Sequence, residues 1–440
     1  MRAAVLAPTV LLGGAAVGGL VTAVTLLPGP IGLAGAVGLL SFGTFLLWPW
    51  AVLPVGIIGG AVVGGLLSRG DVRGYVAVHV LLLAAGYVAL AMRHWLRVEA
   101  RGRRTVGDWG MLSLVAVTAL ATAYGLAVGN PPSEVLVAAY QIAIIPVYFF
   151  LATRTLATPR RLRSAGILYV IIATAFTAFT VAAPGRHGGL LTLLAIPPLV
   201  WAAGRTSGWR RTGAVLLAAF FAVDVLLASY RGIWLAAVLT LAILVLRGGR
   251  SVRTGLVATA ATAVTVAALL ALNSGVRERA GEIAKGMEQS AGYRGVESSI
   301  GLDVFVDRPL IGAGLGQSTP DTYLPGFTIT DVGPVYHAFY VTVLANLGLV
   351  GLAFVLWPIL RSIRAGLGYR DGLALPFAAL SCGFLAAALF AAPTDGHWEL
   401  GLLPALTLLT ARNEFVRHWR TTWPGQAGAI ARITPSRMAT

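Results

Sequence analysis

The chain has 440 residues, 57% of them hydrophobic and only 11% charged, and its mean hydropathy is +0.81. Soluble globular proteins carry about 25% charged residues, so this composition excludes a water-soluble fold and predicts an all-α polytopic membrane protein. The single Cys382 excludes an intramolecular disulfide and a thiolate metal cluster, and the six histidines show no metal-binding spacing. We therefore expect neither a metal nor a cofactor.

The predicted elements begin with an apolar run that follows Arg2 and extends to residue 27. It is long for the apolar core of a signal peptide, and more apolar segments follow, so a retained first helix is favoured over a cleaved signal peptide. The next run, residues 31–67, is too long for one span. The sequence Trp48-Pro49-Trp50 interrupts it, which favours two short helices or a re-entrant pair.

Apolar segments then recur along the rest of the chain, and each is expected to be a helix. They cover residues 75–92, 110–128, 135–152, 164–183, 190–203, 213–229, 232–246, 255–272, 336–360, 372–392 and 398–411. We expect about 12–14 transmembrane helices. Residues 1–272 would form helices with short loops, 273–335 one long extracytoplasmic loop, 336–411 further helices, and 412–440 a disordered cytoplasmic tail.

The net charge of +16 is almost all arginine, and the arginines alternate between connections. The basic loops contain Arg93, Arg97, Arg101, Arg103 and Arg104; Arg154, Arg160, Arg161 and Arg163; Arg205, Arg210 and Arg211; Arg247, Arg250 and Arg253; Arg361, Arg364 and Arg370; and Arg412, Arg417 and Arg420. Basic loops face the cytoplasm, so both termini are predicted inside and the 273–335 loop outside. This explanation of the charge is favoured over nucleic-acid binding, and no nucleic-acid partner is expected.

Two arginines, Arg186 and Arg231, fall in connections predicted to be outside, as do the arginines of the long loop. The positive-inside rule predicts few cations there, so these residues require another explanation. Anion binding is one, because guanidinium groups bind phosphate and carboxylate through paired hydrogen bonds.

The long outer loop carries two helical patterns. Residues 274–290 have an apolar stripe at helical spacing, which predicts an amphipathic helix on the outer leaflet or on the bundle, or equally a solvated connector. A second helix is predicted over residues 296–306, ending near Pro309. The glycine pattern at 312, 314 and 316 lacks the preceding strand of a dinucleotide fingerprint, so it predicts close backbone approach to a neighbouring helix or substrate.

Three local patterns in this half of the chain resemble the bacterial O-antigen ligase and O-antigen polymerase superfamily. The first is the segment 229–235 (SYRGIWL), and the second is Arg294 followed by 307–316 (DRPLIGAGLG). The third is 336–340 (YHAFY) with 346–351 (NLGLVG). The residue after the histidine is Ala338, where the family usually has asparagine. The resemblance covers about residues 210–360.

The resemblance implies a membrane glycosyltransferase of cell-surface polysaccharide biosynthesis. Its donor would be a glycan linked to undecaprenyl diphosphate, and its acceptor a lipid or a saccharide. The protein would be a multi-pass protein of the cytoplasmic (inner) membrane of the cell envelope, surrounded by membrane lipids, with an extracytoplasmic active site. The reaction would be metal-independent. The resemblance does not separate a ligase from a polymerase.

The implied chemistry assigns roles to particular residues. The leaving diphosphate needs positive charge, which Arg231 and Arg294 would supply in place of a metal ion. The acceptor hydroxyl needs a base, and His337 is the candidate, with Glu297, Asp303 and Asp307 as rivals. Further substrate-binding candidates are Arg308, Arg186 and Tyr336. His79 and His397 are interpreted as structural or interfacial residues.

Two other functions fit a multi-spanning chain. A flippase or transporter of lipid-linked saccharides is the main alternative; it would place charges and broken helices near the bilayer midplane. Within the predicted spans Asp224 is the exception to a nearly charge-free interior, which favours a site at the outer surface. A cell-wall glycan polymerase of the shape, elongation and division type would also use an undecaprenyl-linked donor, but its acidic catalytic loop is not found.

Overall fold

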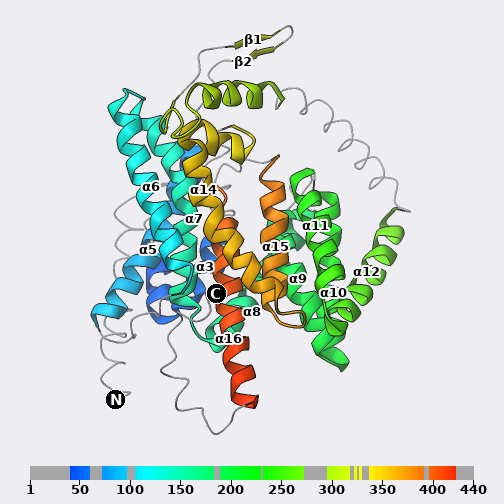
Figure 1. Cartoon of the computed structure of the whole chain (residues 1–440). Coiled ribbons are helices and arrows are strands. Elements are labelled where there is room, and N and C mark those ends of the chain that lie inside the picture. The colour runs from blue at the N-terminus through cyan, green and yellow to red at the C-terminus, as the bar shows by residue number, and fades with distance from the viewer. Residues whose placement is uncertain are drawn as a thin grey trace, which may run out of the picture. The chain divides into compact units, whose positions relative to one another are not determined.

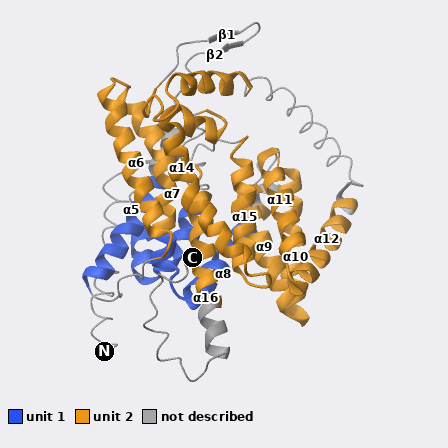
Figure 2. Cartoon of the chain, viewed as in Figure 1, with its two compact units in different colours: residues 1–104, 151–176 blue, residues 105–150, 177–440 orange. Residues whose placement is uncertain are grey.

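The computed structural model describes residues 40–59, 72–96, 105–182, 189–228, 231–271, 295–317, 322–324, 327–329, 336–390 and 396–422. Within these ranges nearly every element is a helix, which confirms the all-α polytopic fold class (Figure 1). The chain divides into two compact units (Figure 2). Unit 1 comprises residues 1–104 and 151–176, and unit 2 comprises residues 105–150 and 177–440.

Unit 1 contains the interrupted apolar run predicted from the tryptophan–proline–tryptophan sequence. A helix over residues 40–47 ends before Pro49. The described elements that follow in unit 1 are η1 (Pro49–Ala51), α3 (Val52–Pro54), the π-helical turn η2 (Val55–Gly59), α5 (Val72–Trp95) and most of α8 (Pro159–Ala182). Proline has no N–H and restricts the residue before it, which explains the break. A Cβ at Gly86 of α5 would lie 2.7 Å from Val52, so glycine permits the close approach of α5 to α3.

Unit 2 carries the candidate site. Its described elements are α6 (Asp108–Ala127), most of α7 (Pro132–Thr155), α9 (Gly189–Arg205), α10 (Gly208–Leu227), α11 (Arg231–Arg247), α12 (Arg250–Ala271), a helix over residues 295–307, the antiparallel strands β1 (Thr322–Leu324) and β2 (Phe327–Ile329), α14 (Phe339–Leu367), α15 (Ala374–Ala387) and α16 (Glu399–Thr422). Helix α16 extends past the boundary predicted at 411, because no proline or glycine follows Ala411 within the helix to stop it.

Small residues bring the helices of unit 2 into contact. Helix α11 packs along α15, where a Cβ at Gly383 would lie 2.5 Å from the Ala236 carbonyl oxygen (Figure 1). Helix α9 packs against α12 in the same way, since a Cβ at Gly255 would lie 2.1 Å from the Val200 carbonyl oxygen. Such small-residue contacts are typical of helix packing in lipid, where apolar burial does not drive association.

Five described helical stretches are long and apolar enough to cross a membrane. They are Asp108–Ala127, Pro132–Thr155, Pro159–Ala178, Arg250–Ala268 and Phe339–Leu367. Large apolar side chains such as Leu120 and Val264 are 70% and 68% exposed, as expected for surfaces that face lipid rather than water. The total of about 12–14 helices includes segments outside the described residues, so the total stays a prediction.

Candidate active site

The helix over residues 295–307 lies against the start of α14. Its apolar residues Val296, Ile300 and Val304 follow one another at four-residue spacing and pack against a cluster that contains Tyr336 and Val341. This spacing forms an apolar stripe that faces α14, and the polar residues Ser299 and Asp303 are exposed away from it. The observed bounds agree with the predicted 296–306, and the helix ends before Pro309 as expected.

His337 contacts Glu297 across 40 residues of chain. Glu297 belongs to the helix over residues 295–307, here called the docked helix. Its side chain is 6% exposed, whereas the side chain of His337 is 45% exposed. An ionised carboxylate only accepts hydrogen bonds, so Nδ1–H of His337 donates to Oε2 of Glu297. This pairing sets the neutral imidazole in the tautomer whose lone pair is on Nε2, which is the arrangement of a histidine base oriented by a carboxylate.

Tyr336 is buried beside this pair and is 1% exposed. Its backbone N–H donates to Oγ1 of Thr342 at 2.9 Å, and a Cβ at Gly301 would lie 3.0 Å from its ring. Burial, reinforced by the negative charge of Glu297, raises the pKa of Tyr336 to about 12. The ring therefore holds the docked helix against α14, and the predicted contact of Tyr336 with substrate stays a prediction.

The glycine-rich segment after Pro309 enters a narrow space between α6, α7 and α14. Gly312, Gly314 and Gly316 all have positive φ values, of 68°, 87° and 84°. A Cβ would lie 2.4 Å from the Asn346 backbone at Gly312, and 2.5 Å from the Val135 backbone at Gly316. Both the backbone conformation and the lack of space require glycine, which confirms the expected close approach to neighbouring helices.

Helix α14 is broken at Gly348, whose φ of 64° and ψ of −164° are not helical. The glycine-rich segment supplies the hydrogen bonds that the break removes. Leu349 and Val350 N–H groups donate to the Pro309 and Leu310 carbonyls at 2.9 and 3.1 Å. In the other direction, the Ala313 N–H donates to the Ala345 carbonyl at 2.8 Å, and the Gly314 N–H donates to that of Asn346 at 3.2 Å. The break and the segment thus form one backbone-paired unit.

Arg308 directly precedes Pro309 and the glycine-rich segment in the chain. Its Nη1 donates to the hydroxyl of Tyr124 on α6 at 3.1 Å, and the side chain is exposed. Further along the segment, Nδ2 of Asn130 donates to the Leu315 carbonyl at 2.9 Å. Arg308 therefore fixes the segment to α6, and its predicted contact with substrate remains a prediction.

Arg231 is the first residue of α11 and is half-buried. A Cβ at the adjacent Gly232 would lie 3.3 Å from the carbonyl oxygen of Ala387, at the end of α15. The next carbonyl, that of Ala388, accepts the Phe339 N–H at 3.0 Å. The chain segments that carry Arg231 and His337 therefore meet at the same terminal turn of α15.

Ala338 occupies the N-cap position of α14. Its φ of −99° and ψ of 115° are extended, as an N-cap requires, but alanine has no side-chain oxygen to accept a hydrogen bond from the first turn. The asparagine usual in the resembling family would supply that acceptor. In this chain the Ala388 carbonyl satisfies the Phe339 N–H, the first of α14.

A second histidine–carboxylate pair lies beside the first turn of α14. Nδ1 of His397 lies 2.5 Å from Oε1 of Glu399, and both side chains are almost fully buried. The His397 ring contacts Phe339 edge-on, with 4.7 Å between ring centroids. Sequence reasoning interpreted His397 as structural or interfacial and did not find its partner. The sequence feature that could have indicated this pair is a histidine two residues before a glutamate at the start of a helix.

Arg186 and Arg294 lie outside the described residues. Of the six predicted site residues, the described ones are therefore Arg231, Arg308, Tyr336 and His337. Within the described ranges, no group of three or more His, Cys, Asp or Glu side chains is placed to hold a metal ion. Metal independence stays a prediction.

The helices and the positioned histidine–carboxylate pair define a polytopic α-helical membrane protein with a polar site at the ends of its helices. Residues 214–356 match the family model described as O-antigen ligase, which confirms the resemblance of this part of the chain to the O-antigen ligase and polymerase superfamily. The match supports an O-antigen ligase-like membrane glycosyltransferase in general. A comparison with curated proteins finds no match.

Proposed function

We propose that the protein transfers a glycan from an undecaprenyl-diphosphate carrier to a lipid or saccharide acceptor at the outer face of the cytoplasmic membrane, without a metal ion. The observation that carries this proposal is the meeting of the Arg231 and His337 segments at one turn of α15. The family match supports the general class of reaction. The carrier, the acceptor and the sidedness belong to the proposal.

The proposed reaction assigns a complementary role to each residue. The acceptor oxygen forms a bond to the anomeric carbon while the bond from that carbon to the diphosphate oxygen breaks. The hydroxyl proton passes to Nε2 of His337, whose Nδ1–H stays on Glu297. The departing undecaprenyl diphosphate carries the electron pair of the broken bond, and the guanidinium of Arg231 neutralises the charge that develops there. Arg294, which precedes the docked helix in sequence, is proposed to assist.

The main alternative, a flippase or transporter, would use a broken helix to bind its substrate. Transporters direct the unpaired backbone groups of such a break toward the substrate or coupling ion. In α14 four of these groups are instead bonded to the glycine-rich segment, two N–H donors to Pro309 and Leu310 and two acceptors to Ala313 and Gly314. This pairing favours a rigid scaffold beside an enzyme site.

The experiment that tests the proposal is glycan transfer by purified protein in detergent micelles. Carrier-linked donor and acceptor are mixed with wild-type protein or with His337→Ala, and products are identified by mass spectrometry. The proposal expects product with the wild type and background amounts with the variant. A transporter needs a sealed membrane and forms no product in micelles. Absence of product from a folded wild type with several donors and acceptors would therefore contradict the proposal.

The same assay distinguishes a ligase from a polymerase by the acceptor that is used. A lipid acceptor that receives a complete glycan indicates a ligase. A carrier-linked repeat unit that lengthens indicates a polymerase. In a deletion strain, long glycans stranded on the carrier would indicate loss of a ligase, and single repeat units would indicate loss of a polymerase.

A further inference from the structure

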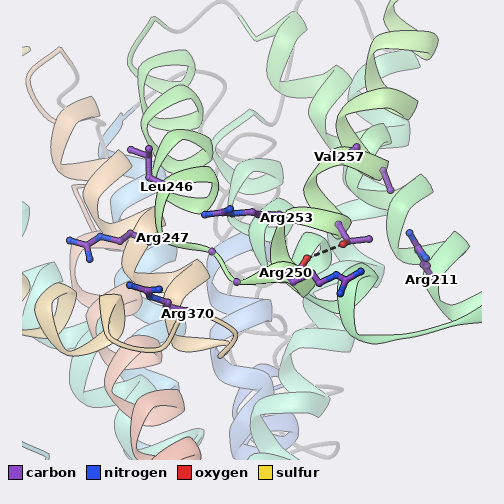
Figure 3. A pocket seen from close by; sticks show the side chains of 11 residues that line it. Arg211, Leu246, Arg247, Arg250, Arg253, Val257 and Arg370 are labelled. Carbon is purple, nitrogen blue, oxygen red and sulfur yellow. Dashed lines mark hydrogen bonds between the residues drawn. The ribbon is translucent and has the colours of Figure 1, made fainter.

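Five arginines line a cavity at the end of α11 opposite to Arg231. The cavity has a volume of about 680 Å³, and Figure 3 shows it at the junction of α11 and α12. The arginines come from four separate parts of unit 2: α10, the end of α11, the first turn of α12, and the turn between α14 and α15. They are Arg211, Arg247, Arg250, Arg253 and Arg370. The basic-loop pattern predicts that this end faces the cytoplasm.

The walls of the cavity are held together by backbone contacts. The Gly249 N–H donates to the Arg370 carbonyl at 2.9 Å, which joins the α11–α12 connection to the α14–α15 turn. A Cβ at Gly249 would lie 2.2 Å from the carboxylate of Asp371, so only glycine allows this contact. The cavity is therefore built by specific packing, and its arginines have more than the topological role of loop cations.

The arginines of the cavity are not paired with carboxylates in the described part of the chain. The nearby Asp371 carboxylate accepts the Ser251 hydroxyl at 2.6 Å and does not line the cavity. Like charges held together repel one another, and a bound anion removes that repulsion through charge-assisted hydrogen bonds. The N-terminus of α12, which begins at Arg250, adds a favourable dipole.

Apolar side chains lie in the same cavity lining. Leu246 of α11 is 74% exposed and Val257 of α12 is 68% exposed. Val257 belongs to α12, whose stretch Arg250–Ala268 is apolar enough to cross a membrane, and both side chains line the cavity together with the arginines. A ligand with a phosphate and an adjoining hydrocarbon chain would satisfy both parts of this lining, whereas a free anion would leave the apolar part unused.

We propose that this cavity binds the phosphate headgroup of an anionic phospholipid from the cytoplasmic leaflet. Guanidinium groups from among these five hold the phosphate, and the acyl chains lie along Leu246 or Val257. Helix α11 has 17 residues and spans about 25 Å, with Arg231 at one end and Arg247 at the other. A lipid bound here braces the end of α11 that is remote from the candidate active site. The proposal does not depend on the proposed reaction.

The test compares lipid binding by purified protein in dodecyl maltoside, by native mass spectrometry and thermal unfolding. The variant is the triple Arg247→Gln/Arg250→Gln/Arg253→Gln. The control is Arg160→Gln/Arg163→Gln/Arg210→Gln, which removes the same charge from exposed residues outside the cavity lining. Added phosphatidylglycerol is expected to raise the unfolding midpoint of wild type and control, and to bind the variant at least about tenfold more weakly.

Three outcomes would overturn the proposal. Equal phosphatidylglycerol binding by the triple variant and the wild type would show that these arginines do not bind the lipid. Equal stabilisation by zwitterionic phosphatidylcholine would show that negative charge is not recognised. Equal stabilisation by inorganic phosphate at matched concentration would assign the cavity to a soluble anion. Should the triple variant fail to fold, Arg253→Gln and Arg370→Gln are compared singly, and unchanged lipid binding by both would have the same meaning.

Discussion

The exposed imidazole of His337 is bonded through Nδ1 to the buried carboxylate of Glu297. The two residues come from different parts of the chain, since Glu297 belongs to the helix over residues 295–307 and His337 lies two residues before the start of α14. The apolar stripe of that helix and the ring of Tyr336 hold the pair in place. An isolated loop histidine would not have a defined orientation, so this contact supports the proposed role of His337 as a base.

Replacing Glu297 tests the orienting role of its carboxylate. We expect Glu297→Gln to lower kcat for glycan transfer by about 10²- to 10⁴-fold, with a smaller effect on KM, because the amide carries no charge to stabilise the protonated imidazole. The control is Asp303→Asn, which removes an exposed carboxylate from the same helix and should leave the rate unchanged. Equal rates for Glu297→Gln and wild type would contradict the orienting role.

The break in α14 depends on glycine at 348. We expect Gly348→Ala to destabilise the protein by about 2 kcal/mol or more, because the added Cβ would lie 2.4 Å from the Leu310 backbone and φ is 64°. Gly213→Ala on α10 is the control; its Cβ would meet no atom within 4 Å, so it should be neutral or slightly stabilising. Thermal unfolding in detergent measures both, and an unchanged midpoint for Gly348→Ala would count against the paired unit.

The N-cap of α14 offers a stabilising substitution. We expect Ala338→Asn to stabilise the protein by about 1 kcal/mol, because the side-chain oxygen can accept an N–H of the first turn that alanine leaves without a cap. Ala338→Ser should act in the same direction. The measurement is the unfolding midpoint in detergent, and a lower midpoint for both variants would show that the site has no room for a cap.

The buried phenol of Tyr336 predicts a pH dependence at high pH. Its pKa is raised from the ordinary 10.0 to about 12, so the folded state holds the proton more tightly than the unfolded state. Between these two values unfolding releases a proton, and the contribution of Tyr336 to stability falls as the pH rises. The difference in unfolding free energy between wild type and Tyr336→Phe should therefore shrink above pH 10.

Glu297 provides an independent check of that pH dependence. Its negative charge contributes to the raised pKa of Tyr336, so Glu297→Gln should move that pKa back toward the ordinary value. Absorbance of the ionised phenol, taken as the difference from the matching Tyr336→Phe proteins, reports the titration. A Tyr336 that ionises at the same pH with and without the Glu297 charge would contradict the assigned cause.

Much of this arrangement could be predicted from the sequence, because it depends on local patterns. The helix predicted over 296–306 is observed over 295–307, and the segment predicted over 232–246 is α11, which begins at Arg231. Apolar spacing and proline positions determine such bounds. The close approach expected of the glycines at 312, 314 and 316 is likewise observed, because positive φ and lack of space both require glycine there.

The long-range contacts could not be predicted in the same way. Glu297 was a rival to His337 as a base, and its role as the partner of that histidine depends on how two elements 40 residues apart pack together. The break at Gly348 was also hidden, because the apolar run continues through it and the compensating bonds come from residues near Pro309. Periodicity shows which face of a helix is apolar but does not show which segment covers it.

In the proposed reaction, fixed arginine charge takes the place of a divalent cation at the leaving diphosphate. The most direct measurement is the rate of glycan transfer by purified wild type and Arg231→Gln, each in excess chelator and in added magnesium, with Arg163→Gln as the control. We expect the rates of the wild type and of the control to be the same in chelator and in magnesium. The rate of Arg231→Gln should be lower than that of the wild type by about 10²-fold or more. A wild-type rate that requires magnesium, or an Arg231→Gln rate equal to wild type, would contradict this proposal.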